Sequence, residues 1–572
     1  MNQVVIHDAQ NKQWLKFSQP IAVVRTNKIT EVLPCLEEVN RLVQQQLWGA
    51  GFLSYEAASA FDSVLLTHQP TDFPLLWFGL YSSPEIITLP TAKEEFALRW
   101  QPTITKEKYN AAIAKIKQYI SNGDTYQVNY TTRLEAEFAG DTWQYFLRLI
   151  EAQQADYGAY IELEKHTICS ASPELFFTLD GQKIVSRPMK GTSARGYTLR
   201  GDRNRAKWLQ NSAKNQAENV MIVDMIRNDL ARIARLGTVN VPNLFQVEQY
   251  PTLWQMTSTV EAETDASLPQ IMEALFPCAS ITGAPKPSTM KIIRELEPSS
   301  RGIYTGTIGY LSPQNQAQFN VAIRTVAINK EASQAEYGVG GGIVWDSASA
   351  SEYEECQIKA RVLLSKVQQF DLLETILWNE TEGYFLLDHH LQRISDSAAY
   401  FKYPLDIPQI KEKLVKTAAN FQLPAYKVRL LVSKQEEIKI EATSQASYPK
   451  TVKLAIAKEP IDTNDPFIYH KTTNRQVYQR FKQAFPHCDD VILWNEKGEV
   501  TETCIYNIVI EKAGRLITPR VESGLLSGTF RAFLLEQQKI EEATVTLEDL
   551  HQSDRIYVIN SVRKWQQGII QD

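Results

Sequence analysis

The alternation of helix-like and strand-like stretches starts afresh near residue 369. A helical stretch, "SEYEECQIKARVLLSKVQQ", ends there, and "FDLLETILWNETEGYFLLDHHLQRI" follows at once with a new strand, turn, strand and helix. A chain of 572 residues is also too long for one core, because single domains usually hold about 100–200 residues. We therefore predict a domain boundary at 367/368. Since no Gly/Ser-rich or Pro-rich spacer separates the halves, we expect them to join closely.

Both halves mix the two kinds of secondary structure. Residues 1–103 hold short apolar runs between loop residues, which indicates a strand-rich part of the first domain. Residues 104–367 alternate helical stretches such as "KEKYNAAIAKIKQYISNGD" with strand-like runs such as "FNVAIRTVAI". Residues 368–572 continue the mixture as a separate domain. The predicted fold class is α+β.

Composition favours small-molecule partners. The net charge of −6 and the lack of Lys/Arg clusters argue against nucleic-acid binding. The sequence has no signal-peptide pattern and no apolar run of about 20 residues, so we expect a cytoplasmic protein that does not bind a membrane. Six scattered cysteines without a CxxC pair predict buried free thiols.

Glu174 and Lys190 lie in two consecutive strand-like runs, "ELFFTL" and "IVSRPMKGT", with Asp180-Gly181 between them. With a three-residue loop, both side chains point to one face of the sheet; with a two-residue loop, they point to opposite faces. An ion pair on the surface of the hairpin is the alternative to a catalytic pair. The hairpin alone does not distinguish these interpretations.

Carboxylates at helix starts suggest a metal site. Glu218 opens a predicted helix that ends at Gly237, and Glu352 and Glu355 share one face of another, which we expect to begin with a capping box at Ser351. Carboxylates without nearby His or Cys suit Mg²⁺. Charges that merely favour the helix dipole are the alternative.

Features that suit an anion accompany these carboxylates. The Gly340, Gly341 and Gly342 triplet allows close backbone approach, and Arg324 could clamp a carboxylate at two points.

Seven motifs follow one another within about residues 104–365: "SPELF", "PMKGT", "AENVMIVDMIRNDL", "ITGAPK", "RGIYTGTIGY", "FNVAIRT" and "GGGIVWDSASASEYEECQIKA". Because they occur in the order found in the chorismate-utilising enzymes, the first half resembles that family. Within the family, "GDTYQVNYTTR" and Lys190 resemble component I of aminodeoxychorismate synthases, since anthranilate synthases have a small residue in place of this lysine. The resemblance implies the family's fold of sheets with flanking helices.

The resemblance also implies roles in converting chorismate. Lys190 would attack C2 while Glu174 protonates the departing C4 hydroxyl, and ammonia would then add at C4. The residues implied to bind are Glu218, Glu355 and Glu352 for Mg²⁺ and the ring carboxylate; Arg324 and Tyr304 for the other carboxylate; and Thr192, Gly340, Gly341 and Gly342 for the rest of the substrate. Two positions depart from the family pattern. Gln255 replaces a histidine of many members, and Asn215 replaces an acidic residue of anthranilate synthases.

The second half carries another candidate lysine, Lys471, just before a predicted helix. Glu502 lies at a strand-like boundary, while Gly528 and Thr529 begin a helix, whose amino terminus suits an anion. Arg393 could supply the countercharge. A Schiff-base lysine, an acidic partner for a pyridine nitrogen and a phosphate site together fit pyridoxal phosphate.

"LLETI", "DHHLQRI", "HKTTNR", "VTETCIYNIVI" and "LLSGTFR" make residues 370–572 resemble fold-type IV pyridoxal-phosphate enzymes, and especially aminodeoxychorismate lyases. The resemblance implies a domain of two α/β subdomains that can pair into a homodimer. It also implies Lys471 as Schiff-base lysine and proton carrier, with Glu502 on the pyridine nitrogen. The implied phosphate ligands are Arg393, Gly528 and Thr529. Arg429 is a candidate for the substrate carboxylate, although "KQEEIKIEAT" replaces the Arg/Gly-rich loop that often follows in this family.

The fusion favours consecutive reactions. The first half would make 4-amino-4-deoxychorismate, and the second would expel pyruvate to leave 4-aminobenzoate. No segment offers the catalytic cysteine of a glutamine amidotransferase, so we expect ammonia from solution or from a separate subunit, and predict the latter. The alternatives are a first half that makes anthranilate or isochorismate, and a second half that is an aminotransferase or only a dimerisation module. A tryptophan-like ligand in the amino-terminal region rests on family analogy alone.

Overall fold

The computed structural model describes residues 2–363, 369–445 and 448–571. The predicted boundary at 367/368 lies outside these residues. The chain forms two compact units. The first comprises Met1–Ala194 and Ala206–Val367, and the second comprises Arg195–Arg205 and Gln368–Asp572. Residues 195–205, which the sequence placed inside the first domain, therefore pack with the second unit.

The first unit contains two ten-stranded sheets in its described residues. One has the order β16 (Gly283–Ala284), β8 (Gln127–Glu137), β20 (Gln334–Ile343), β19 (Thr325–Asn329), β10 (His166–Ser172), β9 (Tyr157–Glu162), β1 (Gln3–Asp8), β2 (Gln13–Phe17) and β6 (Glu85–Ile87), with β7 (Gln101–Pro102) beside β8. The other has the order β13 (Met189–Ala194), β15 (Leu253–Glu263), β12 (Lys183–Arg187), β11 (Leu175–Asp180), β18 (Gln316–Val321), β17 (Thr307–Ser312), β4 (Trp48–Leu53), β5 (Leu76–Tyr81) and β3 (Ala22–Thr26), with β14 (Asn240–Gln249) beside β15.

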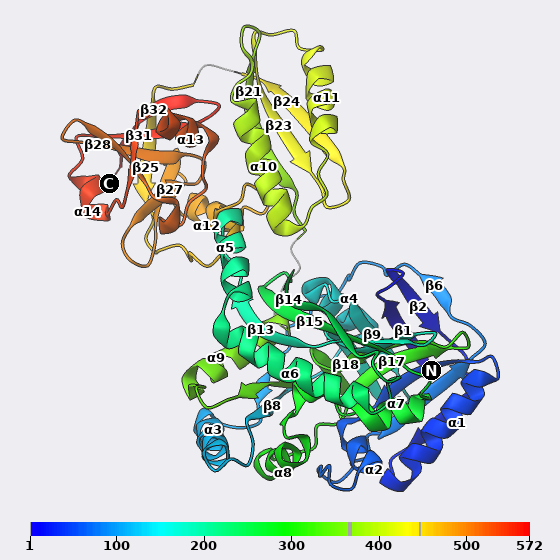
Figure 1. Ribbon diagram of the computed structural model, residues 1–572. Coiled ribbons are helices and arrows are strands. Elements are labelled where there is room, and N and C mark those ends of the chain that lie inside the picture. Colours follow the sequence, from blue (N-terminus) through cyan, green and yellow to red (C-terminus); the bar gives the residue numbers. More distant parts are fainter. Residues whose placement is uncertain (1, 364–368, 446–447, 572) are drawn as a thin grey trace. The chain divides into compact units, whose positions relative to one another are not determined.

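Helices cover the outer faces of these sheets (Figure 1). Their bounds are α1 (Val32–Gln44), α2 (Ala58–Phe61), α3 (Lys106–Ser121), α4 (Thr142–Gln153), α6 (Ala213–Ala231), α7 (Leu268–Leu275), α8 (Lys286–Leu296) and α9 (Ser349–Ala360). Helix α5 (Leu199–Gln210) begins in residues that belong to the second unit. The predicted helices at Glu218 and Glu352 begin earlier than expected, and α9 starts without a side-chain cap, so the capping box expected at Ser351 is absent there.

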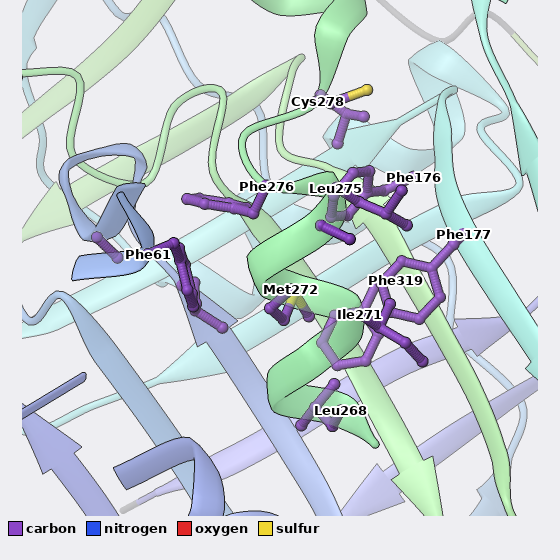
Figure 2. Packing of buried hydrophobic residues seen from close by; sticks show 14 of the residues in the cluster. Phe61, Phe176, Phe177, Leu268, Ile271, Met272, Leu275, Phe276, Cys278 and Phe319 are labelled. Carbon is purple, nitrogen blue, oxygen red and sulfur yellow. The ribbon is translucent and has the colours of Figure 1, made fainter. Parts of the chain in front are cut away.

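Side chains along a strand point alternately to the core between the two sheets and to the helices outside them. In β1, Val4 and Ile6 face a core shared with Phe52 of the other sheet, whereas Val5 faces the helix side, with Phe146 of α4. On the opposite outer face, α7 buries its stripe of Leu268, Ile271, Met272 and Leu275 against β11 and β18 (Figure 2). These two helix-covered sheets form the frame on which the first cavity is built.

The second unit has two sheets in its described residues. A four-stranded sheet has the order β22 (Gly383–Tyr384), β21 (Leu372–Asn379), β23 (Ala425–Val432) and β24 (Ile438–Ser444), and α10 (Leu387–Phe401) and α11 (Ile407–Ala418) pack on it. An eight-stranded sheet has the order β27 (Val500–Thr503), β26 (Asp490–Trp494), β25 (Thr451–Ile456), β32 (Lys564–Ile570), β31 (Arg555–Asn560), β28 (Asn507–Lys512), β29 (Arg515–Pro519) and β30 (Glu541–Ala543). β27 also pairs with β28, and the accompanying helices are α12 (Gln476–Ala484), α13 (Thr529–Glu536) and α14 (Leu547–His551).

The predicted α+β class is confirmed, with two sheet-based subdomains in the second unit. The six cysteines are free thiols, as predicted; four are buried, while Cys35 and Cys488 are half-buried. No helix in residues 2–363, 369–445 and 448–571 has both the length and the hydropathy needed to cross a membrane.

Two candidate active sites

A cavity of about 480 Å³ opens in the first unit. Every site residue predicted for the first half lines it: Glu174, Lys190, Thr192, Glu218, Tyr304, Arg324, Gly340, Gly341, Gly342, Glu352 and Glu355. Strands β13 and β20 supply the lysine and the glycines, and helices α6 and α9 supply the carboxylates of Glu218, Glu352 and Glu355. The fold therefore brings together residues that lie up to 181 positions apart in the chain, from Glu174 to Glu355.

A bulge interrupts the hairpin that lies between Glu174 and Lys190 in the chain. β11 and β12 are joined by a two-residue loop, since Asp180 pairs with Lys183, but the register then shifts between β11 residues, so that Leu175 faces Arg187. This pairing is the one that a three-residue loop would have produced. Lys190 itself lies beyond, on β13, which pairs with β15.

Glu174 is a buried carboxyl group with a defined hydrogen-bond partner. Only 3% of the residue is exposed, and the Ser280 hydroxyl donates to its Oε1 at 2.6 Å. Burial raises the pKa of Glu174 to about 7, against the opposing effects of Ser280 and Lys190. A carboxyl group with this pKa can hold a proton near neutral pH and donate it to a leaving group.

Lys190 has the opposite shift. Burial, followed by the charge of Lys359, lowers the pKa of its amine, while Glu218, Glu174 and Glu355 act against this shift. Gly342 leaves room for this amine, because a methyl group at that position would lie 2.7 Å from Lys190 Nζ and displace it. The site thus favours a neutral amine, the form that acts as a nucleophile.

Three carboxylates face this cavity from two helices. Burial raises the pKa of Glu352, with a further contribution from Glu355, whereas Lys359 lowers the pKa of Glu355 and lies 2.7 Å from it. Glu218 has Lys214 at 3.9 Å. No cluster of three metal-ligating side chains is preformed in the described residues. The oxygen donors nonetheless fit Mg²⁺, which needs only one or two protein carboxylates and keeps several waters.

Tyr304 and Arg324 lie on the cavity wall near the glycines. Tyr304 is 6% exposed, packs on Gly338 and has the Arg133 guanidinium 5.2 Å from its ring centroid. Arg324 adopts a left-handed backbone conformation with φ of 52° and donates to the Lys359 carbonyl oxygen at 2.7 Å. These contacts hold an aromatic hydroxyl and a guanidinium on the same wall.

Sequence analysis missed two residues of this cavity or its immediate surroundings. Lys359 follows Glu355 by one helical turn, a spacing that could have revealed it. The Gln127 side chain is fully buried next to Gly342, and neither its amide nitrogen nor its oxygen has a hydrogen-bond partner among the described residues. Such a buried amide is available to a ligand or a water molecule. Gln255 donates to the Gly191 carbonyl oxygen at 3.0 Å, and Asn215 also lines the cavity.

The second unit holds a cavity of about 310 Å³. It is lined by all six residues proposed for the second half: Arg393, Arg429, Lys471, Glu502, Gly528 and Thr529.

Lys471 and Glu502 are shifted toward their neutral forms. Burial lowers the pKa of Lys471 to about 7, aided by Arg393 and Arg475. Burial raises the pKa of Glu502 to about 7, although the Tyr478 hydroxyl donates to its Oε1 at 2.7 Å and counteracts this. A neutral lysine amine can form a Schiff base, and Glu502 can share a proton with a ring nitrogen.

Arg393 is held by a buried carboxylate that sequence analysis overlooked. Glu374 accepts from Arg393 Nε at 2.8 Å and Nη2 at 2.6 Å, and it also contacts His390 Nδ1 at 2.6 Å. Burial alone would raise the pKa of Glu374, yet Arg393 and His390 lower it to about 2. "LLETI" and "DHHLQRI" contain these residues, but only the packing of α10 on β21 pairs them.

The remaining predicted residues surround this group. Gly528 caps the amino terminus of α13 and contacts Asn507, so no side chain fits there, and the Thr529 hydroxyl lies 3.3 Å from His390 Nε2. The exposed amide groups of a helix start together with Arg393 fit a phosphate. Arg429 also lines the cavity but is paired with Glu441 at 2.9 Å, on the strand that replaces the Arg/Gly-rich loop.

Comparison with known proteins assigns each unit to a class. Residues 84–365 match the family of chorismate binding enzymes, and residues 371–568 match the class IV amino-transferases. The chain therefore joins a chorismate-binding-enzyme domain to a class IV amino-transferase domain. Magnesium and pyridoxal phosphate are the cofactors expected for these two classes.

Particular relatives cover the first half. Over 282 residues, the chain is 42% identical to "Aminodeoxychorismate synthase component 1" of Escherichia coli (strain K12). This match covers 48% of the chain and 62% of the relative. Over 267 residues, it is 38% identical to "Anthranilate synthase component 1 1" of Haloarcula marismortui. That match covers 46% of the chain and 54% of the relative. The chain thus spans less than two thirds of these relatives. Anthranilate synthase component I from Streptococcus pneumoniae TIGR4, at 22% identity and a TM-score of 0.55 over 64% of this chain and 92% of that one, has the same fold.

Proposed function

We propose that this chain converts chorismate to 4-aminobenzoate in two consecutive reactions. The observation that carries the proposal is the pairing, in one cavity, of a nucleophilic lysine, Lys190, with a carboxyl group, Glu174, whose pKa is about 7. Similarity to an aminodeoxychorismate synthase component supports amination at C4. The second unit, with its own lysine, would consume the product.

In the first cavity, Lys190 and Glu174 act at two different carbons of the substrate ring. The neutral amine of Lys190 forms a bond to C2, the two ring double bonds shift, and the C4–O bond breaks. Glu174 gives its proton to the departing oxygen, which leaves as water. Ammonia then bonds to C4 while the double bonds shift back and the C2–N bond to Lys190 breaks. The net change exchanges a hydroxyl group for an amino group and regenerates the lysine.

The other residues of this cavity orient the substrate. Glu218, Glu355 and Glu352 would hold Mg²⁺, whose positive charge, when bound, would attract the ring carboxylate. Arg324 and Tyr304 are suited to the second carboxylate, and the glycines allow the ring to approach β20. Lys359 adds a positive charge that favours the dianionic substrate over a neutral ring.

Ammonia would come from a separate glutamine amidotransferase subunit. The name of the E. coli relative, a component 1, supports this part of the proposal.

In the second cavity, residues of this chain would bind the intermediate and move one proton. Pyridoxal phosphate, when bound, supplies an electron sink that stabilises negative charge next to the amine. Lys471 would hold the cofactor and accept the C4 proton, Glu502 would contact the ring nitrogen, and Arg393, Gly528 and Thr529 would hold the phosphate. Breaking the C3–O bond then releases pyruvate and leaves an aromatic ring.

Product analysis of single-lysine variants tests both reactions. With chorismate, Mg²⁺, pyridoxal phosphate and ammonium, Lys471→Ala should accumulate 4-amino-4-deoxychorismate, and Lys190→Ala should lose at least about a hundredfold in chorismate amination. Lys183→Ala, which removes an exposed lysine on β12, is the matched control. Anthranilate or isochorismate as the product of Lys471→Ala would overturn the assignment. Turnover of the purified chain with glutamine in place of ammonium would overturn the separate subunit.

A further inference from the structure

The second unit includes a short piece of chain from far upstream. Residues Arg195–Arg205 directly follow β13, the strand that carries Lys190, yet they pack with residues 369–445 and 448–571. We call Arg195–Asp202 the inserted segment.

The inserted segment is held in shape by a buried ion pair. Arg195 Nε and Nη2 each donate to one oxygen of Asp202 at 2.7 Å, and the two side chains are only 7% and 2% exposed. The Gly196 amide donates to the same carboxylate at 3.0 Å. Because the loss of either partner would leave an uncompensated buried charge, the pair ties the two ends of the inserted segment together.

Arg195 also fastens the segment to the end of α10. Its Nη2 donates to the Tyr400 carbonyl oxygen at 2.9 Å, and its guanidinium lies 4.4 Å from the centroid of the Tyr400 ring. Helix α10 carries Arg393 about two turns before Tyr400 and His390 about three turns before it, so the segment contacts an element of the second cavity.

The segment further contacts the residue next to Lys471. The Tyr197 carbonyl oxygen accepts from His470 Nε2 at 3.0 Å, and the Ser397 hydroxyl lies 2.9 Å from His470 Nδ1. Burial lowers the pKa of His470 to about 4, so the ring is neutral. Because a carbonyl oxygen can only accept, Nε2 carries the proton and Ser397 donates to Nδ1.

A second contact holds the residue before His470. The ring of Tyr197 stacks on Tyr469 with centroids 5.5 Å apart and an interplanar angle of 10°, and its hydroxyl donates to Asn464 at 2.6 Å. The two residues that precede Lys471 are thus both in contact with Tyr197. On its other side, the Lys471 carbonyl oxygen accepts from the Leu373 amide at 3.0 Å.

We infer that the inserted segment is a positioning element of the second site: Arg195 and Asp202 shape it, and Tyr197 fixes the main chain that carries Lys471. The inference rests on the proposed role of Lys471. It assigns part of the second reaction's machinery to residues that the sequence places in the first domain.

The test compares Arg195→Ala and Asp202→Asn with Arg203→Ala in the full chain. Arg203 is exposed, lies one position beyond the inserted segment and provides a matched loss of charge. The first measurement is the pH dependence of Lys471 acylation in cofactor-free protein, read by mass spectrometry. The charged groups around Lys471, namely Arg393, Arg475, Glu374 and Glu502, are unchanged in all three variants.

We expect Arg195→Ala and Asp202→Asn to raise the pH at which Lys471 acylation is half-maximal. A looser main chain would admit water to the amine and so raise its pKa. Pyridoxal phosphate, titrated by its lysine-bound absorbance, should bind about tenfold more weakly. Compared with Arg195→Ala, Arg195→Lys should partly restore the pH midpoint of acylation and the affinity for pyridoxal phosphate. Arg203→Ala should match the wild type in both measurements. Chorismate amination should change less than twofold, on the order of a neutral surface substitution.

Equal midpoints and equal cofactor affinity in wild type and in a folded Arg195→Ala or Asp202→Asn chain would overturn the inference. If Arg195→Ala does not fold, the acylation midpoints and cofactor affinities of Arg195→Lys and Asp202→Asn are compared with those of the wild type instead. A wild-type chain that does not bind pyridoxal phosphate at Lys471 would instead overturn the proposed function. The acylation midpoints, measured without cofactor, would still decide the role of the segment.

Discussion

Lys190 and Lys471 reach a lowered pKa in different surroundings. Burial makes the largest contribution for both, but Lys190 faces three carboxylates and another amine, Lys359, whereas Lys471 faces the guanidinium groups of Arg393 and Arg475 together with two carboxylates. Glu374 already pairs with Arg393 inside the protein. In the first cavity, two of the carboxylates that face Lys190 are also those proposed to bind a cation. The pKa of Lys190 should therefore change when a cation binds in its cavity, whereas the pKa of Lys471 is largely determined by charged groups of the protein itself.

The largest expected effect is the loss of the acid in the first site, Glu174, which should impair one reaction and spare the other. Glu174→Gln removes the only proton that we propose for the departing hydroxyl, so amination should fall by roughly 10²–10⁴, while release of pyruvate from added 4-amino-4-deoxychorismate should not change. Steady-state rates of both half-reactions measure this. Glu331→Gln, at an exposed site, is the control. An equal loss in both reactions would contradict the separation.

A second comparison concerns stability. Glu374→Gln leaves Arg393 and His390 without their buried carboxylate and should cost about 3 kcal/mol in the free energy of unfolding. The folded-state pKa of Glu374, about 2, lies below its ordinary value of 4.5, so its contribution is fully present above the ordinary value and disappears as pH falls toward 2. Denaturant unfolding should accordingly depend less on pH in the variant between these two values. Glu536→Gln, which breaks the exposed pair with His389, should cost less than about 1 kcal/mol.

Adding Mg²⁺ should affect only one of the lysines. The carboxylates of Glu218 and Glu355 raise the pKa of Lys190, so a cation that neutralises them should lower it further. The acylation midpoint of Lys190 should therefore fall when Mg²⁺ is added to cofactor-free protein and return with a chelator, while that of Lys471 stays constant. A shift at both lysines, or at neither, would argue against a magnesium site formed by these residues.

The smallest expected effect is a change in the pH profile of amination. The reaction needs protonated Glu174, so its rate should fall as pH rises through the pKa of this group, about 7. The Ser280 hydroxyl lowers that pKa, so Ser280→Ala should move the alkaline limb to higher pH by less than about one unit. Ser288→Ala, which removes a hydroxyl bonded to the Asp124 carbonyl oxygen, should leave the limb in place.

The sequence predicted the members of both sites better than their geometry. Lys190, Glu174 and Lys471 could be found because short motifs surround them, and the α+β class follows from the alternation of patterns. Sequence analysis left open whether Glu174 and Lys190 lie on one face, because the answer depended on the register of the hairpin. The structure shows that a bulge shifts this register by one residue, and pairing rules do not place a bulge.

Residues that act through distant partners were harder to predict. Glu374 is 19 positions from Arg393, and nothing local shows that a buried strand residue holds this guanidinium. Gln127 appears in a strand-like motif as an ordinary polar residue, and only burial without a partner distinguishes it. Residues 195–205 fall inside the predicted first domain, because sequence patterns do not reveal which core a short segment joins.

The inserted segment bears on how such a chain could arise or be divided. A gene split near residue 368 would give a carboxy-terminal product without Arg195–Arg205, and His470 would lose the Tyr197 carbonyl group to which it donates a hydrogen bond. A stand-alone enzyme descended from this one would need a substitute for those few residues before it could work independently. The covalent junction between the halves is therefore not the only link that would have to be replaced.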